Sequence, residues 1–158
     1  MPKLKHRKIR VNPDLCTGCT LCAEACSVRK FGAVNPRHAG ITIMRDLFER
    51  FEGQLVCKHC DEPECVKACM SGTMTKDAET GLVSNDPDKC MGCWMCVMVC
   101  PYGSITDKGT NSKKQKTALK CDGCKDLDTP VCVLVCPTKA IMVEETESLL
   151  IRSMQNEK

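Results

Sequence analysis

Apolar and polar residues alternate along this chain only over short stretches, which are flanked by glycine, proline, asparagine or aspartate. Such stretches are typical of short strands, and a Glu79-Thr80-Gly81 turn would join two of them into a hairpin. Residues 23–28 fit a helix. Strands are expected at residues 9–11, 40–44, 73–75, 82–83, 102–106 and 140–143.

Residues 45–53 are expected to leave the body of the protein as a loop. Leu47, Phe48 and Phe51 give this segment an amphipathic character. The three side chains would form either a helical turn packed on the body or a contact surface, and core packing is the favoured interpretation.

Three segments are rich in charge and are expected at the surface. Residues 108–120 contain lysine, glycine, asparagine and serine, which predicts an exposed loop. Its lysines would be solvated, or they would steer an acidic redox partner. The basic residues 1–10 would be a solvated tail or a docking arm. Residues 144–158, with Leu149-Leu150-Ile151, predict a short helical tail.

Cysteine accounts for sixteen of the 158 residues, a share typical of a scaffold built on cysteine chemistry. With an aromatic content of 3%, the apolar core is expected to be thin. Metal binding would compensate, because its free energy becomes folding free energy when the site forms only in the folded protein. Disulfides would need an oxidising compartment. Residues 1–10 carry no apolar signal segment, and no apolar run could span a membrane, so we expect a cytoplasmic, metal-binding protein.

The cysteines fall into four runs of four, each ending in two cysteines separated by three residues. Run three has the spacing of the bacterial ferredoxin motif for a [4Fe-4S] cluster, whose fourth cysteine ligates a second cluster. Zinc sites instead show two separated C-x2-C pairs. The runs are Cys16, Cys19, Cys22 and Cys26 (run one); Cys57, Cys60, Cys65 and Cys69 (run two); Cys90, Cys93, Cys96 and Cys100 (run three); and Cys121, Cys124, Cys132 and Cys136 (run four).

Several residues inside the runs, besides the cysteines, are candidates for a functional role. Run two carries His59 where runs one and three carry a glycine that permits positive φ. A histidine ligates iron in Rieske centres, but four thiolates are already present, so His59 is expected to donate a hydrogen bond near a cluster and tune its potential. Met91, Met95 and Met98 are expected to pack around the inorganic core. Trp94 would shield a cluster or meet a partner.

Taken together, the four runs resemble the four-cluster ferredoxin-type electron-transfer subunits of formate dehydrogenases, molybdopterin oxidoreductases, hydrogenases and carbon monoxide dehydrogenases. The resemblance covers residues 9–143, and the widened second and fourth runs are features of that family. It implies an α+β fold of two interleaved bacterial dicluster ferredoxin-like units, with small antiparallel hairpins and short helices around four [4Fe-4S] clusters. Residues 1–45 and 115–143 would form the outer unit, residues 46–114 the inner unit, and residues 144–158 a tail.

The same resemblance implies that each cluster takes three cysteines from one run and the last cysteine of another. Runs one and four would share two clusters, and runs two and three the other two. The implied ligand groups are Cys16, Cys19, Cys22 and Cys136; Cys121, Cys124, Cys132 and Cys26; Cys57, Cys60, Cys65 and Cys100; and Cys90, Cys93, Cys96 and Cys69.

We therefore expect a carrier of single electrons with no catalytic chemistry of its own, because every cysteine is assigned as a ligand and the three histidines are scattered. Residues 90–101 resemble most the subunits that accompany carbon monoxide dehydrogenase, a nickel-iron-sulfur enzyme. The alternative partner is a tungsten or molybdenum enzyme acting on aldehydes or formate. The acceptor would be a flavoprotein, hydrogenase or ferredoxin, and a homo-oligomer or filament stays open. The net charge of +3 gives no sign of a nucleic-acid partner.

Overall fold

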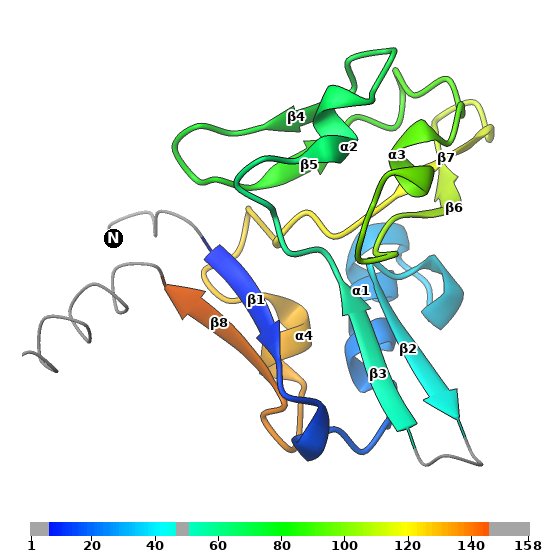
Figure 1. Cartoon of the computed structure of the whole chain (residues 1–158). Helices are drawn as coiled ribbons and strands as arrows, with labels where there is room; N and C mark the ends of the chain where they lie inside the picture. The colour runs from blue at the N-terminus through cyan, green and yellow to red at the C-terminus, as the bar shows by residue number, and fades with distance from the viewer. Residues whose placement is uncertain (1–6, 47–50, 146–158) are drawn as a thin grey trace, which may run out of the picture.

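A computed structural model of the protein describes residues 7–46 and 51–145. Within them the strands form two-stranded antiparallel sheets only (Figure 1). This arrangement suits a sequence whose alternating stretches are too short for a larger sheet. The pairs are β1 (Arg7–Val11) with β8 (Ile141–Glu145), β2 (Ile41–Asp46) with β3 (Phe51–Val56), β4 (Met74–Lys76) with β5 (Val83–Asn85), and β6 (Thr106–Thr110) with β7 (Lys116–Leu119).

The helices are short, and every α-helix carries the third cysteine of a run. Helix α1 is the longest, since it continues past Cys26 to Phe31, where it is capped by Gly32 with a positive φ of 71°. Pro63 and Pro130, which lie in the widened gaps of runs two and four, are the residues before α2 and α4. The helices are α1 (Leu21–Phe31), α2 (Glu64–Lys67), α3 (Met95–Met98) and α4 (Val131–Leu134), with 3-10 turns η1 (Pro13–Leu15) and η2 (Pro36–His38).

The first and last described strands lie side by side, so the two ends of the described structure meet. Ile9 of β1 is opposite Val143 of β8, and Val11 is opposite Ile141. Ile9 and Ile141 are 1% and 2% exposed and belong to a core cluster with Ile41. A second core cluster lies between β4, α3 and β7. Figure 1 shows the two regions, with β1, β8, α1 and α4 below and β4, β5, α2 and α3 above.

Most of the strand predictions are confirmed, and so is the helix at residues 23–28, which extends over Leu21–Phe31. The predicted loop at residues 45–53 is wrong at both ends, because β2 runs to Asp46 and β3 begins at Phe51. Leu47 and Phe48 lie outside the described residues, as do the ends at residues 1–6 and 146–158.

The prediction of an exposed loop over residues 108–120 is also wrong. Strands β6 and β7 form a hairpin there, and only its tip is the polar turn that the composition suggested. Thr117 is fully buried and Ala118 packs in the second core cluster. The strand predicted at residues 102–106 begins instead at Thr106, because the backbone after Cys100 turns, with the Gly103 amide donating to the Cys100 carbonyl over 3.2 Å.

Candidate metal centres

The sixteen cysteines gather into four sets, and each set combines three cysteines of one run with the last cysteine of another. Sets A, C and D each line a hollow of the surface. Set A is Cys16, Cys19, Cys22 and Cys136; set C is Cys57, Cys60, Cys65 and Cys100; set D is Cys69, Cys90, Cys93 and Cys96.

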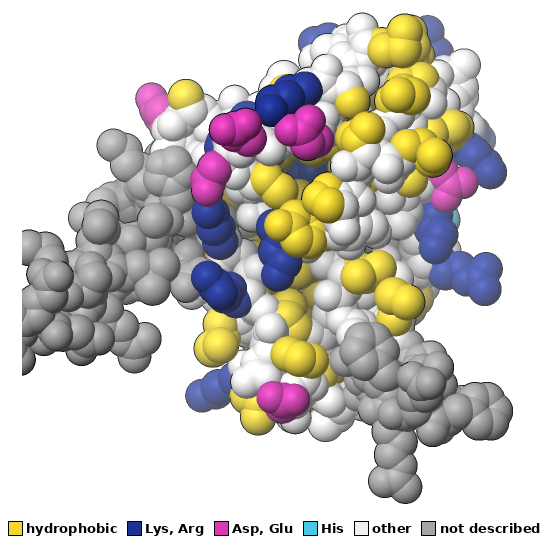
Figure 2. All heavy atoms as spheres, in the orientation of Figure 1, with side chains coloured by type: hydrophobic (Ala, Val, Ile, Leu, Met, Phe, Trp, Pro, Cys, Tyr) yellow, Lys and Arg dark blue, Asp and Glu magenta, His cyan; other side chains and the backbone are white. Residues whose placement is uncertain are grey.

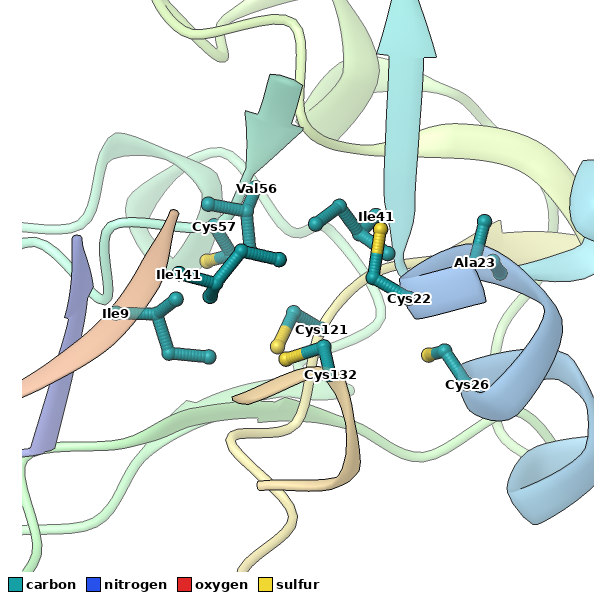
Figure 3. Close-up of a cluster of buried hydrophobic side chains, with 11 residues drawn as sticks. Ile9, Cys22, Ala23, Cys26, Ile41, Val56, Cys57, Cys121, Cys132 and Ile141 are labelled. Carbon is teal, nitrogen blue, oxygen red and sulfur yellow. The ribbon is translucent and has the colours of Figure 1, made fainter. Parts of the chain in front are cut away.

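Set B contains Cys26, Cys121, Cys124 and Cys132 and lies in the interior. Burial, followed by the thiols of Cys121, Cys124 and Cys26, raises the pKa of Cys132, which places the four groups together. In Figure 3 the sulfurs of Cys121 and Cys132 lie together, with Cys57 on one side and the α1 cysteines on the other. These sets have the members that the resemblance implied, and that each set holds one cluster stays a prediction.

A left-handed residue recurs two positions after the first cysteine of every run. Gly18, Gly92 and Gly123 have φ values of 62°, 72° and 69°. His59 adopts a φ of 46° at the same point, which histidine tolerates better than most side chains. Because of this turn, backbone N–H groups donate hydrogen bonds to the sulfur of the first cysteine of the run. The donor-to-sulfur distance is 3.3 Å for Gly18 and Gly123 and 3.5 Å for His59. Such donors stabilise negative charge on the sulfurs.

In three runs, side-chain hydroxyl groups lie within hydrogen-bonding reach of the sulfur of the last cysteine. The sequence reasoning did not predict this feature. Thr73 lies 3.3 Å from the Cys69 sulfur and Ser104 lies 3.4 Å from the Cys100 sulfur. Burial alone would raise the pKa of Cys69, but hydrogen bonds from Thr73, Ser71 and the backbone lower it to about 7. The available signal was a serine or threonine two to four residues after the final cysteine of a run.

Most of the other thiols are held in their neutral form by the fold. Burial raises the pKa of Cys22 and Cys96 to about 11, and that of Cys121 to about 12. Metal coordination requires thiolate, so loading these sites releases protons. All sixteen cysteines are described, and of these only Cys19 in set A and Cys93 in set D are exposed.

His59 is buried between the first two cysteines of run two, with 2% of its surface exposed. Its Nδ1 accepts the Val83 amide hydrogen over 3.0 Å, so the neutral ring carries its proton on Nε2. Burial, followed by the charge of Lys120, lowers the pKa of His59 to about 3. The expectation that this ring donates to a cluster stays a prediction, since Nε2 has no partner among the described residues.

The four sets fit [4Fe-4S] clusters, which are held by four cysteine thiolates. Amide and hydroxyl donors already aimed at the sulfurs supply the surrounding hydrogen bonds that such centres use. Across residues 7–46 and 51–145, no three histidine, cysteine, aspartate or glutamate side chains are grouped as ligands of a single metal ion. Over the same residues, no helix is long and apolar enough to cross a bilayer.

Comparison with family models gives two matches. A model described as a 4Fe-4S dicluster domain matches residues 48–146, and one described as a 4Fe-4S binding domain matches residues 8–34. These two ranges include all four runs.

Comparison with curated proteins gives several relatives. Protein NrfC of Escherichia coli (strain K12) is 37% identical over 141 residues, which cover 81% of this protein and 60% of NrfC. An iron-sulfur protein of Rhodospirillum rubrum is 33% identical over 177 residues, covering 96% and 89%. One subunit of the anaerobic dimethyl sulfoxide reductase of E. coli (strain K12) is 33% identical over 153 residues, covering 83% and 69%. The matched region thus spans less than two thirds of NrfC.

Among solved structures, the active site complex BamBC of benzoyl coenzyme A reductase in complex with zinc has a TM-score of 0.50. The sequence identity is 22%, with 95% of this protein and 88% of the other covered. At that sequence identity, the similarity shows a shared fold and nothing about function.

Proposed function

This protein belongs to the 4Fe-4S dicluster domain family, and from this premise we propose that it relays single electrons through four [4Fe-4S] clusters between a catalytic oxidoreductase subunit and a separate acceptor. One observation carries the proposal: every set takes three cysteines from one run and the last from another. Each cluster, when bound, accepts and releases one electron. The protein holds the clusters at fixed separations and supplies the hydrogen bonds that set their potentials.

The sets follow one another in the order A, B, C, D. Cys22 of set A is close enough to Cys132 of set B to contribute to its raised pKa. Cys57 of set C does the same for Cys121 of set B. Helices α2 and α3, which carry one cysteine each of sets C and D, pack against one another. Sets A and D are therefore the two ends of the proposed relay.

Both proposed ends reach the surface, because Cys19 of set A and Cys93 of set D are the exposed cysteines. Near Cys19 in the sequence, Leu15 is 47% and Leu21 is 44% exposed. Near set D, Met91 is 64%, Met95 is 42% and Met98 is 80% exposed, so these side chains lie at the surface and not in the interior packing that the sequence suggested. In the view of Figure 2, apolar side chains are visible over the upper part of the protein, where α2 and α3 lie in Figure 1. Exposed methionine adapts to varied partner surfaces, so we place one docking site here and the other beside Cys19.

For the catalytic partner we propose carbon monoxide dehydrogenase, on the resemblance carried by residues 90–101. A tungsten or molybdenum enzyme acting on aldehydes or formate is the alternative. One relative bears on the general class: the dimethyl sulfoxide reductase subunit is a named part of a reductase.

We further propose that the protein does not catalyse a reaction itself, because all sixteen cysteines have a place in the four sets. A purely structural role for the clusters is the competing hypothesis. The structural and electron-transfer hypotheses differ in one observable respect. Clusters that only hold the fold together need not be reducible at the potentials found in cells.

The division into an outer unit (residues 1–45 and 115–143) and an inner unit (residues 46–114) remains our proposal. The pairing of β1 with β8 supports joining the first and last segments. The β2–β3 and β6–β7 hairpins lie across the two boundaries and connect the proposed units.

The test begins with anaerobic purification from the native cells without detergent, followed by an iron count. We expect about sixteen irons per polypeptide, four for each cluster. A nickel protein in the same complex would identify carbon monoxide dehydrogenase, and tungsten or molybdenum the alternative. Eight irons or fewer in intact protein, zinc in place of iron, or clusters that cannot be reduced would each contradict the proposal.

Two matched variants then test the sharing of cysteines between runs. Cys22 and Cys26 lie one turn apart on α1 but fall in sets A and B. Electron paramagnetic resonance should show that Cys22→Ala and Cys136→Ala perturb one cluster, whereas Cys26→Ala and Cys132→Ala perturb another. If Cys22→Ala and Cys26→Ala perturb the same cluster, the ligand sets are wrong.

A further inference from the structure

Lys120 is a buried lysine at the contact between sets B and C. Only 3% of the residue is exposed. It directly precedes Cys121 of set B and follows β7, in the segment that the sequence suggested would be solvated. Burial of an ammonium group is costly unless hydrogen bonds or opposite charges compensate it, so this position calls for an explanation.

Hydrogen bonds fix the Lys120 ammonium between the two sets. It donates to the carbonyl of Cys121 over 2.7 Å and to the carbonyl of Val83. Val83 lines the hollow of set C, and its amide donates to His59 within run two. The backbone of Val83 therefore connects the loop of run two with the lysine that precedes run four.

Cysteines of both sets lie close enough to Lys120 for its charge to act on them. Lys120 lowers the pKa of Cys65 in set C, against the larger effect of burial, and acts in the same direction on Cys121 in set B. Among the residues that the structure describes, no carboxylate forms an ion pair with Lys120. The nearby Asp122 pairs with Arg29 and Lys30 instead. When they hold clusters as thiolates, the cysteines of the two sets are thus the anions available to compensate the lysine.

We propose that Lys120 is a positioning charge that raises the reduction potentials of the clusters in sets B and C relative to those in sets A and D. The inference rests on the proposed function, because it requires clusters in those sets. Reduction adds one electron and one negative charge to a cluster, and an ammonium held nearby in a poorly solvated interior stabilises that added charge. The two central clusters of the relay would then be easier to reduce than the terminal ones.

The test is a redox titration of the holoprotein, followed by electron paramagnetic resonance, on wild type, Lys120→Met and Lys120→Arg. In Lys120→Met we expect the equilibrium constant for reduction to fall about tenfold or more at two of the four clusters, which is 59 mV for one electron. Lys120→Arg keeps the charge and should restore both potentials toward the wild-type values.

Lys58→Met is the matched control. Lys58 lies between two cysteines of set C, but its side chain is exposed and near the Tyr102 ring, so solvent screens its charge. Its removal should change the same equilibrium constants by much less than tenfold. Unchanged potentials in Lys120→Met, or an equal shift of all four, would overturn the inference.

A second variant, Lys120→Gln, covers the case in which Lys120→Met loses clusters. In Lys120→Gln the side-chain amide can still donate to a carbonyl, so the potentials can be measured on it if Lys120→Met binds less iron than wild type. Iron loss in both variants with retention in Lys120→Arg would overturn the inference, since Lys120 would then be needed for assembly. A wild-type protein with few irons or irreducible clusters would instead contradict the proposed function.

Discussion

Asp122 connects run four to the end of α1 through two cations, and its replacement by asparagine tests the electrostatics of that contact. Its carboxylate lies 3.0 Å from the Arg29 guanidinium and 3.4 Å from the Lys30 ammonium. The three side chains are only 24%, 17% and 14% exposed. Burial would raise the pKa of Asp122, but Lys30 and Arg29 lower it to about 2 from its usual 3.8.

The lowered pKa gives the size of the expected effect. At 1.36 kcal/mol for each tenfold change in proton affinity, the shift corresponds to a little over 2 kcal/mol. The carboxylate is still partly solvated, and screening reduces this to about 1–2 kcal/mol. Asp122→Asn leaves Lys30 without its partner and Arg29 with Asp126 alone. For a protein of this size, the apparent Tm should fall by roughly 2–8 °C.

The assay is thermal loss of the visible cluster absorbance of anaerobic holoprotein at one fixed scan rate, because the transition is expected to be irreversible. Asp126→Asn is the matched control. Asp126 also pairs with Arg29, but its side chain is 61% exposed, so we expect an effect below about 1 kcal/mol.

The pH dependence has a defined sign. A carboxylate whose folded pKa is lowered contributes stability that is fully present above its unfolded pKa of about 3.9 and is lost as the pH falls toward 2. The difference in Tm between wild type and Asp122→Asn should therefore stay constant from about pH 6 to pH 8. Equal Tm values for wild type and Asp122→Asn, or equal losses in the two variants, would refute the reasoning.

Three further predictions concern single residues. Gly123→Ala should lower the apparent Tm of the holoprotein, because an alanine would be strained at φ 69° and its Cβ would lie 2.6 Å from Leu82; a Tm equal to wild type would contradict this. Gln54→Leu removes a donor to the Cys16 sulfur and should lower the potential of the cluster in set A by on the order of 40 mV in the redox titration, with the other potentials unchanged. In apoprotein treated with iodoacetamide near neutral pH, Cys121 should react later than the two exposed cysteines, because burial raises its pKa to about 12; mass spectrometry of the alkylated peptides reads the order.

The sequence predicted most about the metal centres, because the spacing of cysteines around a cluster is set by the cluster itself. The left-handed turn at Gly92 followed from its place in run three. Which runs contribute cysteines to the same set was not contained in that spacing. It came from resemblance to a family, since contacts between residues as distant as Cys22 and Cys136 depend on the whole fold.

The misassigned segment at residues 108–120 shows the limit of composition as a guide. Lysine and glycine predict solvent exposure, and the tip of the β6–β7 hairpin agrees with that rule. Thr117 and Lys120 are nevertheless buried, because β7 lies against the core that holds set D and leads directly into run four. A buried ammonium becomes understandable only when its two carbonyl acceptors are known, and these come from Val83 and from Cys121.

The pairing of β1 with β8 also has a consequence for how the protein matures on the ribosome. A nascent polypeptide that has passed Cys100 already contains every cysteine of sets C and D. Set A lacks Cys136 until the strand that closes against β1 is about to emerge. Strand β8 is the last described element to be synthesised, so the run-one cysteines of set A are without Cys136 for most of synthesis. Run one therefore lacks the last cysteine of its set for a longer part of synthesis than any other run does.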